Sequence, residues 1–535
     1  MINKNNSYLP IIIAIIFALG IFLGTILDSP LQQKGNNFSF LNNSKTKLGT
    51  ILSYISQDYV DSVNIEQIED DAITGILSKL DPHSEYILSK EYNKINDPLF
   101  GNFDGIGVQF RIEKDTIMII RAIPGGPSEK IGIRDGDRIV TIDNDTVVGK
   151  DITNEKVMKK LKGKKGTQVK VGIFRKKAKG LISYTITRDV IPTYSVDISY
   201  KPTDSIGYIK LSRFSATSYK EVHKSLKELK AKGATKFILD LRENGGGYMQ
   251  AAIHIADDFI KKDKLIVYTE GNNRPKQVAY ATEGGICEDD KVIILIDEAS
   301  ASASEILAGA IQDNDRGILI GRSTFGKGLV QEQIRLQDGS AIRLVVARYH
   351  TPTGRCIQRP YTKGKTEYYN EFYKRWLTGE LESADSIKYN DSLKYTTPKG
   401  KIVYGGGGIT PDIFVSIRDR NINEYMGDLL QQGVFYRFAF DYADKHREEL
   451  KAYNNAETYI KEFTIDENII NKFNALSKKD GITFNKKLYK ESLYEIKILL
   501  KALIGRNIYD NEGFYPVYLK TDPIFNKALE YYTNH

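Results

Sequence analysis

The regular alternation of strand and helix patterns after residue 205 constrains the fold of this chain more than any other feature. Short apolar runs at 207–211, 236–241 and 292–296 have the length of buried strands. The helical patterns that separate them are expected at residues 218–230 and 302–312. Such alternation is typical of a mostly parallel sheet covered by helices. The sequence therefore predicts an α/β core, which we place at 191–420.

The second half of this core contains more strands and an insertion. Strands are expected at 317–320, 329–336 and 341–348, and we expect one sheet to continue across both glycine-rich corners. A segment rich in Tyr, Lys and Glu, at about 359–399, interrupts the core before the glycine-rich run at 405–412 closes it.

The flanking regions have different patterns. Residues 105–110 lead into a strand, and further strands are expected at 116–121 and 139–142, so the sequence predicts a compact β-rich module at 100–190. Helical spacing predicts an N-terminal helical region before this module and a helical extension after the core. Their bounds are 46–99 and 421–535.

The N-terminal segment has the apolar composition of a membrane anchor or a signal peptide. Residues 9–27 form an uncharged apolar run, just long enough to cross a bilayer as a helix. The rival interpretation is a cleaved signal peptide, but the flank at 25–30 offers no small-residue cleavage site. We therefore expect an anchor at 1–28 and a linker at 29–45. Lys4 before the segment and Asp28 after it favour export of the remaining chain.

Composition excludes several classes of function. The chain has 76 Lys and Arg against 68 Asp and Glu, interleaved along its length, so no nucleic-acid partner is indicated. Its six histidines show no metal-ligand spacing, and we expect no metal and no cofactor. The two cysteines, Cys287 and Cys356, are too few for a disulfide framework. The length of 535 residues allows several domains.

The segment Ser300-Ala301-Ser302-Ala303-Ser304-Glu305 is the first candidate for chemistry, because it joins a buried strand to a helix. A helix N-terminus presents unpaired amides that stabilise an oxyanion, so a nucleophile is well placed there. The alternative is that these serines only cap the helix.

A serine nucleophile needs a base, and Lys327 is the best-placed lysine. It lies between Gly326 and Gly328 in a loop that joins two expected strands. If the segment is extended, Gln331 lies on the same face and its amide can orient the amine. The alternative is an ordinary solvated lysine.

Two other glycine-rich segments allow competing interpretations. Residues 321–327 match a phosphate-binding loop until Gly328 replaces the magnesium-binding hydroxyl, and a strand follows where a helix is required. The corner at 240–247 offers amides for an oxyanion hole or is simply a tight turn.

The β-rich module offers a binding function. Its loop of Gly105, Ile106, Gly107 and Val108 can direct successive amides at a peptide carboxylate. The edge of the following strand can pair with the peptide backbone.

Taken together, these segments resemble the carboxy-terminal processing peptidases, also called tail-specific proteases, from about residue 81 to 415. The resemblance rests on motifs at 80–84, 105–108 with 136–137, 240–247, 300–305, 326–328 and 353–355. It implies a crotonase-type α/β core and a PDZ domain whose 105–108 loop binds the tail. The departures are Gly245 where proline is common, the insertion, and the C-terminal extension, which put substrate access and partners in doubt.

The resemblance also implies roles for individual residues. It gives Ser302 as the nucleophile, Lys327 as the base and Gln331 as its support. The oxyanion hole would be formed by the amides of Ala303 and Gly246, with Gly247 as the adjacent alternative.

The implied function is that of a serine endopeptidase that cuts exported proteins near their C-termini, with exposed C-terminal tails as its substrates. The other implied partners are the membrane, through the N-terminal helix, and a second copy of the chain or an adaptor. The implied location is the bacterial inner membrane, with one span and the bulk of the chain in the periplasm. The alternative is a tethered PDZ scaffold whose core is inert.

Overall fold

The structure is a computed structural model that describes residues 46–113, 115–175, 178–420 and 422–535. It divides into two compact units after Gly75. In the first unit, helix α2 (Lys47–Asp58) follows its N-cap Thr46, whose hydroxyl accepts a hydrogen bond from the amide of Gly49. Helix α3 (Ile65–Leu77) also begins in this unit. The expected anchor and linker lie outside the described residues. No helix in the described part of the chain combines the length and apolar character that a membrane span requires.

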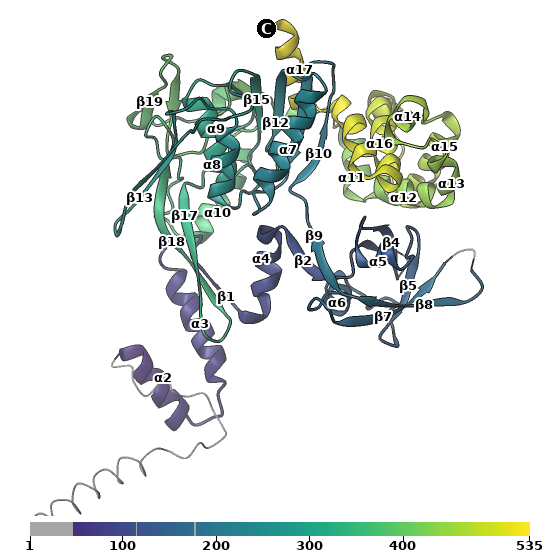
Figure 1. Ribbon diagram of the computed structural model, residues 1–535, viewed down its shortest axis with the longest axis horizontal. Helices are drawn as coiled ribbons and strands as arrows, with labels where there is room; N and C mark the ends of the chain where they lie inside the picture. Colours follow the sequence, from purple (N-terminus) through teal and green to yellow (C-terminus); the bar gives the residue numbers. More distant parts are fainter. Residues whose placement is uncertain (1–45, 114, 176–177, 421) are drawn as a thin grey trace, which may run out of the picture. The chain divides into compact units, whose positions relative to one another are not determined.

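The second unit contains the α/β core, which is confirmed. A six-stranded sheet has the order β10-β11-β12-β15-β16-β21, and Figure 1 shows helices beside its strands. The strands are β10 (Val196–Tyr200), β11 (Ile206–Leu211), β12 (Lys236–Asp240), β15 (Lys291–Ile296), β16 (Ile318–Gly321) and β21 (Ile413–Phe414). All neighbours from β11 to β21 are parallel, and β10 is an antiparallel edge. The covering helices are α7 (Ser218–Ala231), α8 (Met249–Asp257) and α9 (Ala303–Asp313).

Both faces of this sheet are buried, which explains why its strands are apolar without alternation. Along β15, Ile294 and Ile296 pack in a cluster with side chains of α7, α8 and α9. Ile293 and Leu295 point the other way and pack in a cluster that contains Phe525. Phe525 belongs to α17 (Pro523–Asn534), so α17 supplies a layer of the core although it lies far from the strands in sequence.

The expectation that one sheet continues across both glycine-rich corners is wrong. After β16 the chain enters a second sheet, where β17 (Leu329–Arg335) and β18 (Ala341–His350) form an antiparallel hairpin. A short connection such as the turn at Gly339 can join antiparallel strands, whereas a parallel neighbour needs a crossover of roughly a dozen residues. The remaining strands of this sheet are β1 (Glu85–Ile87), β13 (Leu265–Gly271) and β14 (Arg274–Tyr280).

The β-rich module is an antiparallel sheet with its own apolar core. Its strands and helices are β3 (Val108–Glu113), β4 (Thr116–Ala122), β5 (Arg138–Ile142), β6 (Asp145–Thr146), β7 (Gln168–Phe174), β8 (Leu181–Thr187), α5 (Pro127–Lys130) and α6 (Asn154–Leu161). A separate pair, β2 (Asn102–Gly105) and β9 (Asp189–Pro192), flanks it. Strand β3 is at the edge of the sheet, with β4 as its neighbour, so its outer side can accept a peptide strand.

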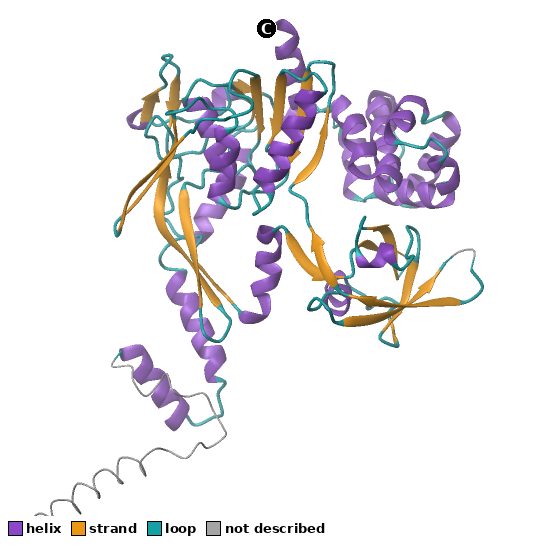
Figure 2. Cartoon of the chain, in the orientation of Figure 1, coloured by secondary structure: helices purple, strands orange, loops and turns teal. Residues whose placement is uncertain are grey.

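The C-terminal region is helical, as expected, and Figure 2 shows it as a group of helices. Its helices are α11 (Glu424–Gln431), α12 (Val434–Lys445), α13 (Arg447–Lys451), α14 (Ala456–Glu462), α15 (Glu467–Lys479) and α16 (Lys486–Tyr518). They share an apolar cluster of their own. The remaining elements are α4 (Tyr92–Phe100), α10 (Lys365–Leu377), β19 (Lys394–Thr396), β20 (Ile402–Tyr404) and short 3-10 turns at 89–91, 384–386, 391–393, 417–419 and 519–521.

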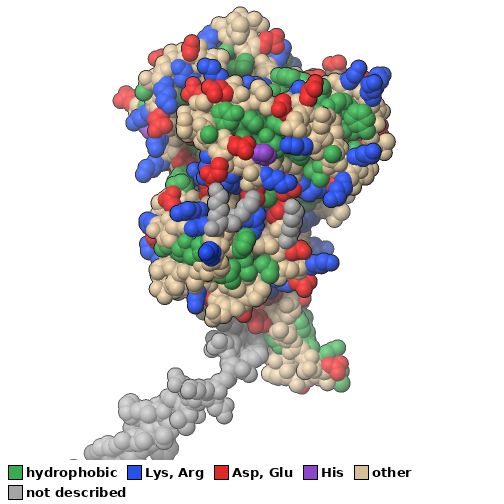
Figure 3. Space-filling view, turned by 90° about the vertical axis from the view of Figure 1, so that its right-hand side faces the viewer, with side chains coloured by type: hydrophobic (Ala, Val, Ile, Leu, Met, Phe, Trp, Pro, Cys, Tyr) green, Lys and Arg blue, Asp and Glu red, His purple; other side chains and the backbone are tan. Residues whose placement is uncertain are grey.

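On the face drawn in Figure 3, basic and acidic side chains are interspersed and neither sign forms a continuous field. Across the described residues, no group of three His, Cys, Asp or Glu is arranged to hold a metal ion. Cys287 and Cys356 are free thiols.

Candidate active site

Ser302 lies where the loop after β15 turns into α9. It is the N-cap of this helix, and its backbone has φ 57° and ψ −115°. A serine that only caps a helix takes an extended conformation. A positive φ at a residue with a side chain costs roughly 1–3 kcal/mol and is concentrated at functional sites. The backbone at Ser302 therefore favours the nucleophile interpretation over capping alone.

Lys327 lies in the loop that leads from β16 to β17. Its Nζ donates a hydrogen bond to Oε1 of Gln331 at 2.7 Å, although a bulge between Val330 and Gln331 disturbs the simple alternation that was expected. The amide nitrogen of Gln331 donates in turn to the carbonyl of His83 at 2.7 Å. The amine, the amide and the carbonyl thus form one chain of hydrogen bonds.

The electrostatic surroundings of Lys327 disfavour its ammonium form. Burial lowers the pKa of Lys327 from its usual value, and the nearby Arg343 guanidinium lowers it further. Glu85 and Glu305 act in the opposite direction but more weakly. Among the described residues no carboxylate forms an ion pair with Nζ, so burial prevails.

Glu305 joins the two sides of the site, a role that the sequence did not indicate. This fully buried carboxylate accepts hydrogen bonds from the amides of Ser302, Gly326 and Lys327 at 2.8, 2.7 and 2.9 Å. It also accepts one from the hydroxyl of Thr324 at 2.5 Å. Burial raises the pKa of Glu305, and these donors oppose that rise. One side chain therefore fixes the backbone of the serine and of the lysine together.

Tyr349, on β18, provides a second link between the same residues. Its buried hydroxyl lies 3.1 Å from the carbonyl oxygen of Ser302 and 2.7 Å from that of Lys327. The signal for this role is hidden in the sequence, because Tyr349 comes from the second sheet and looks like an ordinary core residue.

The phosphate-loop interpretation of residues 321–327 does not fit this geometry. In such a loop the backbone amides point at a phosphate. Here the amides of Gly326 and Lys327 are already bound to Glu305, and the chain continues into a strand.

The glycine corner after β12 packs directly against the serine. A Cβ added at Gly246 would lie 2.8 Å from Cβ of Ser302 and 3.0 Å from the amide nitrogen of Ala303, so a side chain is excluded there. The amide of Gly246 donates to Oδ1 of Asn244 at 2.9 Å. The amide of Gly247 makes no hydrogen bond within the described residues. Of the two amides at this corner, only that of Gly247 is without a hydrogen-bond partner among the described residues.

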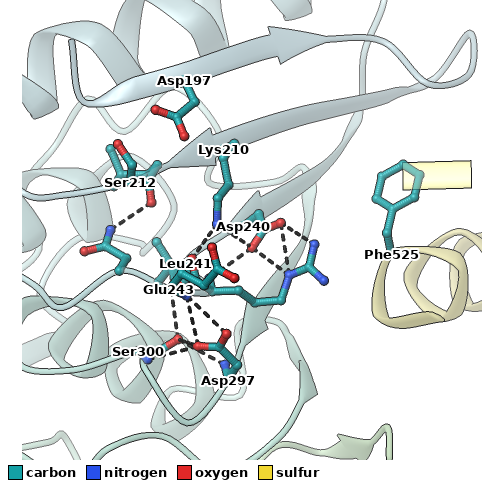
Figure 4. A network of polar contacts seen from close by, with 12 residues as sticks. Asp197, Lys210, Ser212, Asp240, Leu241, Glu243, Asp297, Ser300 and Phe525 are labelled. Atoms are coloured by element: carbon teal, nitrogen blue, oxygen red, sulfur yellow. Dashed lines mark hydrogen bonds and ion pairs between the residues drawn. The ribbon is translucent and has the colours of Figure 1, made fainter. Parts of the chain in front are cut away.

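Behind this corner lies a buried network of charges, drawn in Figure 4. Asp240 binds the guanidinium of Arg242 at 2.6 Å and lies 3.4 Å from Nζ of Lys210. Burial alone would raise the pKa of Asp240, but Arg242 and Lys210 hold it below its usual value. Ser300 donates to the carbonyl of Leu241 at 2.8 Å, which ties the corner to the serine loop.

The 105–108 loop lies between β2 and β3, at the mouth of a small cavity of about 270 Å³. Gly107 has φ 72°, a left-handed conformation in which glycine is favoured. Apolar side chains of Phe103, Phe110 and Met158 line the cavity. Lys94 and Arg213 add positive charge, while Lys162 pairs with Asp97 at 2.8 Å in the same lining. The cavity therefore suits an apolar side chain that is followed by a carboxylate.

A serine at a helix N-terminus and a desolvated lysine, both held by one buried carboxylate, are the arrangement of a serine peptidase that uses lysine as its base. The comparisons with known proteins agree with that class. Residues 205–366 match peptidase family S41, and residues 105–185 match the PDZ domain. Residues 425–510 match a family of unknown function.

The chain belongs to the carboxy-terminal processing proteases of family S41 and is a serine endopeptidase with a PDZ domain. It is 33% identical over 350 residues to the carboxy-terminal-processing protease of Bartonella bacilliformis, which covers 64% of this chain and 80% of that relative. It is 36% identical over 318 residues to carboxy-terminal processing protease CtpA of Bacillus subtilis, 58% of this chain and 66% of the relative. The photosystem II D1 C-terminal processing protease aligns with a TM-score of 0.37 and 24% identity, covering 70% of this chain and 88% of that one.

Proposed function

We propose that this endopeptidase cuts exported proteins near their C-termini, with Ser302 as the nucleophile and Lys327 as the general base. The observation that carries the proposal is the position of Lys327, whose amine is desolvated and bound to a neutral amide. The backbone amide of Lys327 binds the same carboxylate, Glu305, as the backbone amide of Ser302. A lysine in such a place can be uncharged near neutral pH.

The reaction begins when neutral Lys327 takes the proton of Ser302 as its Oγ attacks the scissile carbonyl. The amides of Ala303 and of the glycine corner hold the oxyanion, with Gly247 favoured over Gly246 because the Gly246 amide already binds Asn244. The ammonium of Lys327 then protonates the leaving amine, and an acyl-enzyme remains. Water, deprotonated by the same lysine, releases the product and restores Ser302.

In this proposal the PDZ domain selects the tail. The 105–108 loop receives the substrate carboxylate, and the edge of β3 pairs with the residues that precede it. Arg213 and Lys94 at the cavity favour a negatively charged end.

The same proposal assigns residues 9–27 to a membrane anchor that leaves the bulk of the chain in the periplasm. The test is to fractionate cells that express the full chain and a version without residues 1–28. The full chain should resist alkaline extraction from membranes and be digested by external protease in spheroplasts. Release of both versions as soluble protein would reject the anchor.

Digestion of an unfolded protein, followed by mass spectrometry of the fragments, tests the chemistry. The wild-type chain should release short C-terminal fragments first. Ser302→Ala and Lys327→Ala should each lower the rate by about 10⁴-fold, because removing a nucleophile or its base leaves only binding and oxyanion stabilisation. Cleavage by Ser302→Ala at the wild-type rate would falsify the nucleophile assignment.

The alternative, an inert tethered scaffold, predicts tail binding without turnover. A fluorescent peptide with a free carboxylate, and its amidated control, should separate the two cases. Binding without cleavage by the wild-type chain would favour the scaffold.

A further inference from the structure

The insertion at 359–399 was expected to affect access and partners, but its helix contacts the loop that carries Lys327. The guanidinium of Arg375, on α10, donates to the carbonyl of Thr324 and to the carbonyl of Ser323, both at 2.9 Å. These are the residues that lead into Gly326 and Lys327. Arg375 is buried, and Glu380 holds its third nitrogen at 2.8 Å.

A second side chain of α10, Tyr368, contacts His83, whose carbonyl binds Gln331, the partner of the Lys327 amine. The hydroxyl of Tyr368 lies 3.0 Å from Nε2 of His83, and the two rings meet edge to face at 5.2 Å. The carbonyl of His83 holds the Gln331 amide, and Gln331 holds Lys327. Burial lowers the pKa of His83 to about 4, so its ring is neutral near pH 7.

Arg359 packs against both the loop before Lys327 and α10. Its guanidinium lies 4.3 Å from the ring centre of Phe325 and 4.8 Å from that of Tyr368. Its amide donates to the carbonyl of Gly326 at 3.0 Å. Within the described residues its three buried guanidinium nitrogens make no hydrogen bond. Cation–π contacts with the two rings therefore take the place of hydrogen bonds to the guanidinium, and they connect α10 to the loop.

We propose that α10 is a positioning element of the catalytic machinery, in which Tyr368 holds Gln331 through His83 and Arg375 fixes the loop before Lys327. The inference rests on the proposed role of Lys327 as the base. Proton transfer from Ser302 requires the amine within hydrogen-bond reach, and a displacement of about 1 Å can cost about a hundredfold in rate. Tyr368 and Arg375 act through other residues and need not touch the substrate.

The two faces of α10 offer a matched control. Tyr368 is 1% exposed, whereas Tyr373 on the same helix is 67% exposed. Tyr368→Phe and Tyr373→Phe each remove one hydroxyl and keep the ring. Tyr368→Phe should lower kcat about tenfold with KM within twofold, because the hydroxyl loses its contact with the His83 ring and a weaker one, at 3.4 Å, from Nε2 of Gln358. Tyr373→Phe should leave both constants unchanged.

A pair of substitutions at Arg375 tests the loop contact. Arg375→Met should lower kcat about a hundredfold, and Arg375→Lys should recover a large part of that loss, since an ammonium can still donate to one of the two carbonyls. Labelling of Ser302 by a fluorophosphonate measures the same step without a peptide. It should slow in proportion to kcat in each variant.

The inference is overturned if Tyr368→Phe matches Tyr373→Phe in kcat, or if both Arg375 variants lose thermal stability while their kcat per labelled site stays at the wild-type value. Lys327→Ala, assayed beside them, separates this inference from the proposal on which it rests. If Lys327→Ala stays active, the base is misassigned. If Lys327→Ala is inactive and Tyr368→Phe is normal, only the role of α10 is rejected.

Discussion

The same core buries a lysine in two regions, and it does so in opposite ways. Lys210, on β11, lies among charges, 3.4 Å from Asp240 and in contact with the carbonyl of Arg242. Lys327, in the loop before β17, meets the neutral amide of Gln331 at 2.7 Å. Both amines are buried, so the two sites differ in the group that each amine contacts.

The hydrogen-bond partner of a buried lysine therefore decides whether its ammonium or its neutral amine is favoured. A carboxylate in a low-dielectric surrounding stabilises the ammonium and makes a structural ion pair. An amide dipole orients the amine without supplying a counter charge, so desolvation prevails and the pKa of Lys327 falls. The first region holds the glycine corner in place, and the second suits the general base that we propose.

The largest expected effect comes from removing the counter charge in the first region. Asp240→Asn leaves the buried Lys210 and Arg242 without their shared partner and should cost about 3–5 kcal/mol in the free energy of unfolding. Urea denaturation measures the change. Asp289→Asn, in the exposed pair with Lys261, is the control and should leave the urea midpoint unchanged.

Placing a carboxylate beside Lys327 should make the second region resemble the first. Gln331→Glu should raise the pKa of Lys327, so that the neutral amine becomes scarce and kcat/KM near pH 7 falls by about 10- to 100-fold. Because the base must be deprotonated, the rate should recover as the pH rises through the new pKa. Gln331→Met is the control. It should lower the rate without moving the profile to the alkaline side, and an equal alkaline shift would contradict the argument.

Replacing each lysine by methionine should change stability in opposite directions. The folded pKa of Lys327 lies below its unfolded value, so the unfolded chain binds the proton more readily and the buried amine costs stability below the unfolded pKa. Lys327→Met should therefore stabilise by about 1 kcal/mol, with activity lost. Lys210→Met should destabilise by about 1–3 kcal/mol because Asp240 loses a partner. Thermal unfolding at pH 7 compares them, and equal signs would refute the contrast.

Two buried tyrosine hydroxyls allow a further comparison of the two regions. Tyr208 donates to the Asp240 carboxylate at 2.7 Å, and Tyr349 contacts the carbonyls of Ser302 and Lys327. A hydrogen bond to a charged group is worth roughly 1.5–3 kcal/mol, and one to a neutral group about 1 kcal/mol. Tyr208→Phe should therefore destabilise more than Tyr349→Phe. A larger loss for Tyr349→Phe would indicate strain stored between the serine and the lysine.

The sequence predicts those parts of the site that depend on local patterns. Ser302 follows a buried strand and precedes a helix, and Lys327 lies between glycines, so both stand out without a structure. The role of Glu305 could not be predicted, because its partners at 324–327 lie about twenty residues further along the chain. The same holds for Tyr368, whose contact with His83 spans 285 positions.

The error in sheet assignment has a similar cause. Residues 329–336 have a strand pattern whichever sheet they join, and only the hairpin turn at Gly339 indicates an antiparallel partner. The contribution of α17 to the core was not expected either, since an amphipathic helix gives no sign of the surface that it covers.

The position of α17 bears on how the protein is made. Lys327 precedes Pro523 by 196 positions, so at roughly 5–20 residues per second a ribosome needs about 10–40 s to reach the helix after Lys327 has been added. During that interval Ile293 and Leu295 lack their cover, and the nascent sheet is exposed to aggregation and to chaperones. The core of this peptidase is therefore completed only late in synthesis.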